Sequence, residues 1–229
     1  MKVLITFGPS AEPIDAVRHI SNLSSGELGT ILAETFANAG HEVLCFRGTQ
    51  STHPPPKNVN TIIPFQTNYD LLEKICSHAH EFDLILHTAA LADFTPTLVI
   101  ADGKPLPAGK ELGKLKSHFT DIVIHFRSAI KILPKLRELF PKATICSWKY
   151  EVDGDVQIAI QEGRKQIKKY KVDSCVVNGP AIGHQFLLLS SEDNEPLAFP
   201  GKQELAEGLL LLWGEDKPQK PGYSENHQP

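Results

Sequence analysis

Continuously apolar runs alternate with longer mixed runs along most of the chain, and this pattern predicts alternating strands and helices. The run "FDLILHTAALADF" begins without a polar interruption, as expected of a strand buried on both faces of a sheet. The predicted strands are Lys2–Phe7, Glu42–Phe46, Val59–Pro64, the start of 82–94, 119–126, Ala143–Trp148 and Asp173–Val177. The predicted helices are Leu28–Ala39, Tyr69–His78, Ala129–Phe140, Val156–Tyr170 and Gln203–Trp213.

This alternation predicts an α/β fold: a Rossmann-like, mostly parallel, doubly wound sheet with flanking helices. Two short strands, Phe186–Leu189 and Pro196–Phe199, are expected to add a small β-hairpin across "SSEDNE". Residues 98–113 are rich in Gly, Pro and Lys and are expected to form a mobile loop. We expect residues 1–214 to form one α/β domain and the polar tail, 215–229, to be disordered.

Composition narrows the functional classes. The chain has 229 residues, of which 41% are hydrophobic and 22% charged, which is ordinary for a globular protein. A formal net charge of −4 argues against a nucleic-acid partner. No apolar run is long enough for a membrane span, and no signal-peptide pattern is present. The four cysteines form no Cys-x-x-Cys pair, so we expect buried reduced thiols and a cytoplasmic location.

In an open parallel sheet, ligands bind beyond the carboxyl ends of the strands, here after Phe7, His87, Trp148 and Val177. The stretch "ISNLSSGELG" follows the first of these ends. In it Ser24 or Ser25 can cap a helix, Gly26 lets an anion approach, and Gly29 permits close packing. An ordinary capped helix is the alternative. The spacing matches neither Gly-x-Gly-x-x-Gly directly after a strand nor a P-loop.

Residues 6–29, "TFGPSAEPIDAVRHISNLSSGELG", resemble the signature of the phosphopantothenate–cysteine ligases, also called phosphopantothenoylcysteine synthetases. That signature reads Thr-x-Gly-Gly-Thr, then Glu, Ile-Asp, Val-Arg, Ile-Ser/Thr-Asn and Ser-Ser/Thr-Gly-x-x-Gly. The segments "HTAALADF", "GKLKS", "CSWKYEVD" and "IKKYKVDSCVVNG" resemble its later elements, in the single-function form. Three departures concern glycine or aspartate positions: Pro9 and Ser147 replace glycines, and Gly179 replaces an aspartate. Ser10 stands where the pattern has a threonine.

The resemblance implies an enzyme of coenzyme A biosynthesis that joins 4′-phosphopantothenate and L-cysteine through an acyl-nucleotide. The implied cosubstrate is CTP, or ATP as in eukaryotic relatives, with Mg²⁺. It also implies a homodimer in which residues 98–118 contribute across the interface. Because the sequence lacks an upstream flavin domain, a separate phosphopantothenoylcysteine decarboxylase is expected in the pathway.

The resemblance also assigns roles to individual residues. Asn22 would bind an acyl oxygen, and Lys169 would neutralise charge on the α-phosphate or the collapsing intermediate. Lys114 and Lys116 would fold over the triphosphate as a lid. The implied substrate-binding residues are Arg18, Ser24, Ser25, Gly26, Gly29, Ala89 and Ala90. The implied nucleotide-binding residues are Gly8, Ser10, Asp93, Phe94, Lys114, Lys116, Lys149 and Asn178.

Other readings of these residues stay open. Lys169 lies in the basic run "RKQIKKYK", which is typical of a solvated helix face, and Asn178 could serve only a turn. A catalytically silent nucleotide- or flavin-binding relative is one rival, supported by the three departures. A short-chain NAD(P)-dependent oxidoreductase is another, but the sequence offers no Tyr-x-x-x-Lys pair in the expected helix.

Overall fold

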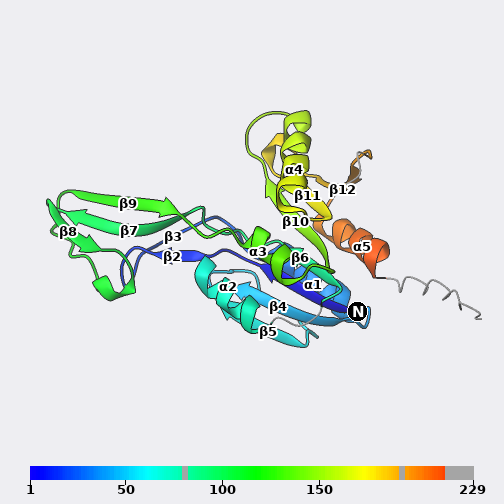
Figure 1. Cartoon of the computed structure of the whole chain (residues 1–229), viewed down its shortest axis with the longest axis horizontal. Coiled ribbons are helices and arrows are strands. Elements are labelled where there is room, and N and C mark those ends of the chain that lie inside the picture. The colour runs from blue at the N-terminus through cyan, green and yellow to red at the C-terminus, as the bar shows by residue number, and fades with distance from the viewer. Residues whose placement is uncertain (79–81, 191–193, 215–229) are drawn as a thin grey trace, which may run out of the picture.

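The computed structural model describes residues 1–78, 82–190 and 194–214. Within them, an eight-stranded sheet has the order β13-β12-β11-β10-β6-β1-β4-β5 (Figure 1). The pairings from β5 to β11 are parallel, whereas β12 and β13 add antiparallel at one edge. The strands are β1 Lys2–Phe7, β4 Glu42–Gly48, β5 Thr61–Phe65, β6 Leu84–His87, β10 Thr144–Tyr150, β11 Ser174–Asn178, β12 Phe186–Ser190 and β13 Leu197–Phe199.

Strand order reverses between β1 and β6, because the chain moves from β1 outward to β4 and β5 and then returns to β6. This is the topology of a Rossmann-like, doubly wound sheet, so the predicted fold class and the β12–β13 hairpin are confirmed. The helices are α1 Glu27–Asn38, α2 Asn68–Ser77, α3 Ile132–Leu139, α4 Val156–Tyr170 and α5 Lys202–Trp213.

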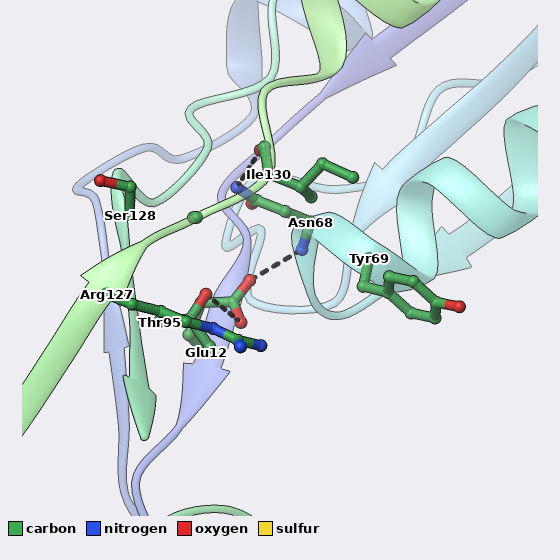
Figure 2. Close-up of a pocket in the computed structure, with 8 residues that line it drawn as sticks. Glu12, Asn68, Tyr69, Thr95, Arg127, Ser128 and Ile130 are labelled. Carbon is green, nitrogen blue, oxygen red and sulfur yellow. Dashed lines mark hydrogen bonds between the residues drawn. The ribbon is translucent and has the colours of Figure 1, made fainter. Parts of the chain in front are cut away.

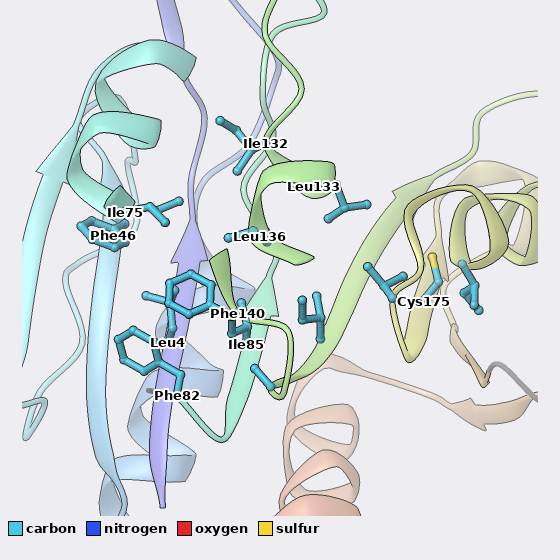
Figure 3. Packing of buried hydrophobic residues seen from close by; sticks show 14 of the residues in the cluster. Leu4, Phe46, Ile75, Phe82, Ile85, Ile132, Leu133, Leu136, Phe140 and Cys175 are labelled. Carbon is cyan, nitrogen blue, oxygen red and sulfur yellow. The ribbon is translucent and has the colours of Figure 1, made fainter. Parts of the chain in front are cut away.

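Helices cover both faces of the sheet and give it two apolar cores. On one face, Leu32 and Phe36 of α1 and Leu205 of α5 pack on Val3 and Ile5. The opposite face carries α2, α3 and α4 (Figure 3). Alternate residues of β1 therefore point into different cores, which explains the unbroken apolar run in the sequence. The members of the core beneath α2, α3 and α4 that Figure 3 labels are Leu4, Phe46, Ile75, Phe82, Ile85, Ile132, Leu133, Leu136, Phe140 and Cys175.

A second sheet extends to one side of the first (Figure 1). We call residues 94–128 the arm; it contains β7 Phe94–Ala101, β8 Lys104–Pro107, the short helix η1 Lys110–Leu112 and β9 Ile122–Ser128. Its strands pair antiparallel in the order β8-β7-β9. The prediction of a mobile loop over 98–113 is therefore wrong: most of that segment lies in β7, β8 and η1.

The loop after β1 is also more ordered than the sequence suggests. Its residues form a small antiparallel hairpin, β2 Ala11–Pro13 and β3 His19–Ser21, beside the arm. Asp15 at the hairpin turn accepts a hydrogen bond from the backbone N–H of Leu115, at 3.0 Å. The backbone N–H of Gly109 bonds the carbonyl of Ile14 at 3.0 Å. The hairpin thus holds the end of the arm through contacts some hundred residues apart in sequence.

The remaining differences are shifts in element boundaries. The helix predicted from Ala129 begins instead at Ile132, because Lys131 is extended. Helix α4 has the predicted bounds, with the Asp155 side chain accepting hydrogen bonds from the first turn. The predicted tail, 215–229, and part of the β12–β13 turn, 191–193, lie outside the described residues. In the described part, no helix is both long and apolar enough to cross a membrane.

Candidate functional site

Two segments of the chain pair just beyond the carboxyl ends of β1 and β6, where the strand order reverses. Pro9 and Ala90 form an isolated parallel bridge there. The Ser10 N–H bonds the Ala90 carbonyl at 3.2 Å, and the Ala90 N–H bonds the Gly8 carbonyl at 3.0 Å. The buried Ser10 hydroxyl accepts the Ala92 N–H at 2.8 Å. We call residues 8–10 and 88–92 the edge joint.

Asn22 lies beside the edge joint. Its Nδ2 donates a hydrogen bond of 2.8 Å to the Leu91 carbonyl, while the residue remains exposed. The structure therefore brings together Asn22, Gly8, Ser10, Ala89 and Ala90, which lie in two parts of the sequence. The amide of Asn22 is oriented but still accessible to a ligand.

Helix α1 begins next to these residues, but not with the expected serine cap. Gly26 occupies the N-cap position with a left-handed backbone, φ 82°. The Ser25 hydroxyl instead accepts the N–H of Glu27, in the first turn, at 3.2 Å. A side chain on Gly26 would also lie within 3.0 Å of Ser51, so this position requires glycine. The prediction that a serine holds the cap position is wrong, whereas the helix start at the site is confirmed.

Two other glycines of the predicted site have packing roles. A Cβ on Gly29 would lie 2.0 Å from the Cβ of Phe7, so glycine lets α1 approach β1, as predicted. A Cβ on Gly8 would lie 1.9 Å from the Ser51 hydroxyl, and Gly8 has φ 77°. At both positions a neighbouring residue, Phe7 or Ser51, lies so close to the backbone that only glycine fits.

Arg18 contacts the arm rather than the edge joint. Its guanidinium pairs with Asp15 and donates to the Leu115 carbonyl at 3.3 Å. Burial disfavours the charged form of Asp15, but backbone N–H groups of Leu115, Val17 and Arg18, together with the guanidinium, outweigh it and lower its pKa. Arg18 therefore secures the arm, besides any role toward substrate.

Several other predicted site residues belong to the arm and to α4. Lys114 and Lys116 are exposed on the arm, and Phe94, which begins it, is 54% exposed. Lys169 is exposed in the last turn of α4, with Nζ 5.1 Å from the ring centre of Tyr170. Tyr170 lines the cavity described below, between α3 and α4, so Lys169 lies close to that cavity.

A cavity of about 250 Å³ lies next to the edge joint, between α3 and α4 and the carboxyl ends of β6 and β10. Ala89, Leu91 and Ala92 line it from the edge joint. Asp93 lies at its rim in an ion pair with Lys131, Oδ1 to Nζ 2.5 Å, and both side chains are more than half exposed. Two predicted residues, Asp93 and Lys149, thus share this cavity with one predicted substrate-binding residue, Ala89.

Lys149 is the second cation of this cavity, and Asn178 ends the neighbouring strand. Lys149 Nζ lies 3.2 Å from Glu151 Oε1. The Asn178 carbonyl accepts the Glu151 N–H at 2.8 Å. Lys131 was not identified from the sequence, where it is one lysine in an ordinary helix-like run. Only the pairing of β9 with β7 places it opposite Asp93.

His87 is a further residue that the sequence did not single out. It is the last residue of β6, is 8% exposed and lines the cavity. Its Nδ1 lies 2.5 Å from the hydroxyl of the buried Thr6. Burial lowers the pKa of His87 to about 4, so the imidazole is neutral at physiological pH. A histidine at a strand end beyond an apolar run was the signal available in the sequence.

A larger cavity, about 430 Å³, lies where the arm meets the main sheet (Figure 2). Its polar groups mainly bond one another. The buried Glu12 accepts the Asn68 N–H at 2.8 Å and the Thr95 hydroxyl at 3.3 Å. Asn68 Nδ2 bonds the carbonyls of Ala92, at 2.8 Å, and Ile130, at 3.2 Å. These contacts join α2 to both connections of the arm, so this cavity marks a structural junction.

No group of three or more His, Cys, Asp or Glu side chains placed to hold a metal ion occurs in the described ranges. Mg²⁺ commonly binds through substrate phosphates with one or two protein carboxylates at most, and does not require a protein cage. The exposed Asp93 carboxylate fits such a limited role.

Comparison with known proteins identifies the family. The model of the DNA/pantothenate metabolism flavoprotein C-terminal domain (DFP) matches residues 1–210. The chain belongs to the DFP family. The coenzyme A biosynthesis bifunctional protein CoaBC of Methanocaldococcus jannaschii is 31% identical to it over 182 residues, covering 77% of this chain and 40% of that protein. CoaBC of Thermococcus kodakarensis is 30% identical over 224 residues, covering 93% and 50%.

A solved structure agrees with this assignment. The DNA/pantothenate metabolism flavoprotein from Streptococcus pneumoniae superposes with a TM-score of 0.79 at 26% identity, covering 93% of this chain and 97% of the other. The present DFP chain spans about half the length of the CoaBC proteins it matches, 40% and 50% in the two cases above.

Two of the three departures from the ligase pattern have packing explanations in this DFP chain. Nothing in the structure explains Pro9, whose backbone carbonyl lies against Gly48, where a Cβ on Gly48 would be 2.2 Å away. The buried Ser147 hydroxyl donates to the Ser174 carbonyl at 3.2 Å. Gly179 has φ 121°, and a Cβ there would lie 2.3 Å from the Glu151 carbonyl oxygen.

Gly179→Asp, which introduces the residue of the ligase pattern, is expected to destabilise this chain. The backbone conformation at 179 is nearly restricted to glycine, and the side chain would collide with backbone. We expect a loss of about 3 kcal/mol in the free energy of unfolding, measured by urea denaturation. Gly183→Asp is the matched control, because Gly183 also has positive φ, 77°, but faces open space. Equal losses in the two variants would contradict a steric role for Gly179.

The low pKa of His87 predicts a specific acid sensitivity. In the unfolded chain the imidazole has its ordinary pKa of 6.5, whereas in the fold it is about 4. The unfolded state therefore takes up the proton first, and stability present above pH 6.5 is lost as pH falls toward 4. Between pH 7.5 and pH 5 this amounts to about 2 kcal/mol.

His87→Gln should lack this part of the acid-induced loss, measured by urea unfolding at the two pH values. The exposed His184 provides the control: His184→Gln should keep the wild-type pH dependence. A His87→Gln variant as acid-sensitive as the wild type would show that His87 is not held neutral by burial.

Proposed function

We propose that this DFP chain is a phosphopantothenate–cysteine ligase of coenzyme A biosynthesis. The observation that carries the proposal is the position of Asn22, whose amide is held at the Leu91 carbonyl beside the cavity at the strand-order reversal. Family membership and the coenzyme A biosynthesis names of the relatives support the same activity.

The proposed reaction has two steps. The carboxylate of 4′-phosphopantothenate attacks the α-phosphate of the nucleotide, forming an acyl-nucleotide and releasing pyrophosphate. The amine of cysteine then attacks the acyl carbon, the nucleoside monophosphate leaves, and the amine loses a proton as the amide forms. Nucleotide activation supplies the leaving group, so the protein mainly positions the reactants and stabilises charge.

The site offers groups suited to these tasks. The Asn22 amide would bind the acyl oxygen, on which negative charge develops as the cysteine amine adds to the acyl carbon. The first N–H groups of α1, beside Gly26, would bind phosphate or carboxylate oxygens. Lys131 and Lys149 at the cavity would exchange their present carboxylate partners for ligand phosphate. Each task falls to a group that the edge joint or a strand end positions.

We propose CTP as the nucleotide, with ATP as the alternative, and Mg²⁺ bound chiefly by its phosphates. Both nucleotides carry the triphosphate that the lysines and the helix start would recognise, so the base remains to be established by assay. The proposal includes the assignment of residues 1–214 as one ligase domain and a cytoplasmic location. We further propose that the decarboxylase step belongs to polypeptide outside this sequence, since the CoaBC relatives are named bifunctional and are about twice as long.

We also propose a homodimer formed through the arm. Strand β9 is an edge strand of the arm sheet, and both of its faces present apolar side chains to solvent: Val123 is 45% exposed on one and Phe126 is 43% exposed on the other. An exposed apolar edge strand is a template for pairing with another chain. Such a dimer would let Lys114 and Lys116 of one chain serve the site of the other.

Ligation is tested by pyrophosphate release with phosphopantothenate, cysteine, Mg²⁺ and either CTP or ATP. We expect Asn22→Ala to lower kcat/KM about 100-fold, by the loss of one oxyanion donor. Lys169→Gln should lose amide product, because Lys169 would neutralise charge on the α-phosphate or the collapsing intermediate, and its neighbour Tyr170 lines the cavity. Lys168→Gln, an exposed neighbour, is its control. Absence of pyrophosphate with both nucleotides would favour a catalytically silent relative.

Dimer formation is tested by light scattering after size exclusion. Phe126→Asp places a charge on the exposed face of β9 and should shift the protein toward monomer, with little change in melting temperature. Lys168→Asp on exposed α4 changes charge elsewhere and should leave the mass unchanged. A wild-type protein that is monomeric at micromolar concentration would contradict the proposed dimer.

A further inference from the structure

A row of four polar residues crosses the sheet on the face covered by α2, α3 and α4. Thr6 pairs with His87, His87 with Ser147, and Ser147 with Cys175, on adjacent strands β1, β6, β10 and β11. The residues two positions earlier on the first three strands are apolar members of the core on this face. Polar groups beneath helices are costly unless hydrogen-bonded, so each member of this polar row requires a partner.

Ser147 and Cys175 find their partners within the protein. The Ser147 hydroxyl donates to the Ser174 carbonyl at 3.2 Å and accepts from Gln166 Nε2 at 3.0 Å. Gln166 Nε2 also lies 3.4 Å from the sulfur of Cys175. Burial raises the pKa of the Cys175 thiol to about 12, so this part of the row is uncharged.

His87 is different, because only one of its ring nitrogens is used. Nδ1 bonds the Thr6 hydroxyl at 2.5 Å. Within the described residues, no hydrogen bond reaches Nε2, although the residue is more than nine-tenths buried and lines the cavity between α3 and α4. A ring held at one nitrogen and free at the other is preorganised to bind something in that cavity.

The charges around the cavity indicate what that ligand is like. The cations, Lys131 and Lys149, lie toward the open side, with 52% and 36% of their side chains exposed. The imidazole at the bottom is neutral, and Ala89 and Leu91 supply apolar walls. A fitting ligand carries negative charge at one end and an uncharged hydrogen-bonding group at the other.

We propose that His87 Nε2 binds the uncharged, amide-like group of a phosphate-bearing ligand whose anionic end points toward Lys131 and Lys149. This inference rests on the ligase function proposed above. Two ligands of that reaction share the required chemistry: phosphopantothenate, through its amide, and the nucleotide, through the amide-like edge of its base. Thr6 is a positioning residue, since it holds the ring in place without reaching the cavity.

Isothermal titration with phosphopantothenate, CTP and ATP separately tests this assignment and distinguishes the ligands. His87→Leu should weaken one of them about tenfold and leave the others within twofold. Thr6→Val keeps the ring but removes its hydrogen bond, and should weaken the same ligand to a smaller extent. Ser147→Ala is the matched control in the same row, because its hydroxyl is fully buried and bonded within the protein.

A second measurement uses the wild-type protein and does not depend on the variant folding. In a long-range ¹H–¹⁵N spectrum, the Nε2 resonance of His87 should shift on adding the same ligand and not on adding the others. Unchanged affinities in His87→Leu together with an unmoved Nε2 resonance would overturn the inference alone. Equal losses for all three ligands would assign His87 a purely structural role. Absence of binding to wild type by every ligand would overturn the proposed function itself.

Discussion

The pairing of two chain segments beyond the carboxyl ends of β1 and β6 is the contact on which the site depends. The buried Ser10 hydroxyl and the backbone groups of Gly8 and Ala90 hold these segments together. Strand ends normally diverge at a reversal of strand order, and the crevice left there is where such folds bind ligands. In this chain the edge joint closes part of that crevice, and it carries the Asn22 contact and one wall of the cavity. The residues that follow these two segments lead to the start of α1 and to the arm, and the cavity lies beside them.

The sequence predicted the main sheet well because its signals are local. The unbroken apolar run of β1 indicates burial on both faces, and Asp155 caps α4 within its own first turn. The arm was mispredicted because its order is not local. Glycine, proline and lysine in 98–113 suggest a loop, yet backbone pairing with β9 and the bond from Leu115 to Asp15 order the segment. These partners cannot be inferred from the composition of the segment itself.

The residues of the candidate site likewise fall into those that the sequence predicted and those that it missed. Asn22, Gly26 and the alanines of the edge joint were found because they share a compact pattern with a known family, and the fold brings them together. His87, Lys131 and Gln166 were missed because each is unremarkable in its own run, and only strand register places them around one cavity. Lys169 matched a motif, and its neighbour Tyr170 lines the same cavity.

The β2–β3 hairpin contributes to two structures at once. At its turn, Asp15 and Arg18 hold Leu115 of the arm, and immediately after it the chain places Asn22 at the Leu91 carbonyl. Only a few residues separate these contacts, so a displacement of the arm is transmitted to Asn22. If the arm is where two chains meet, association and ligand binding share one free-energy cycle. The apparent affinity for ligand would then depend on protein concentration.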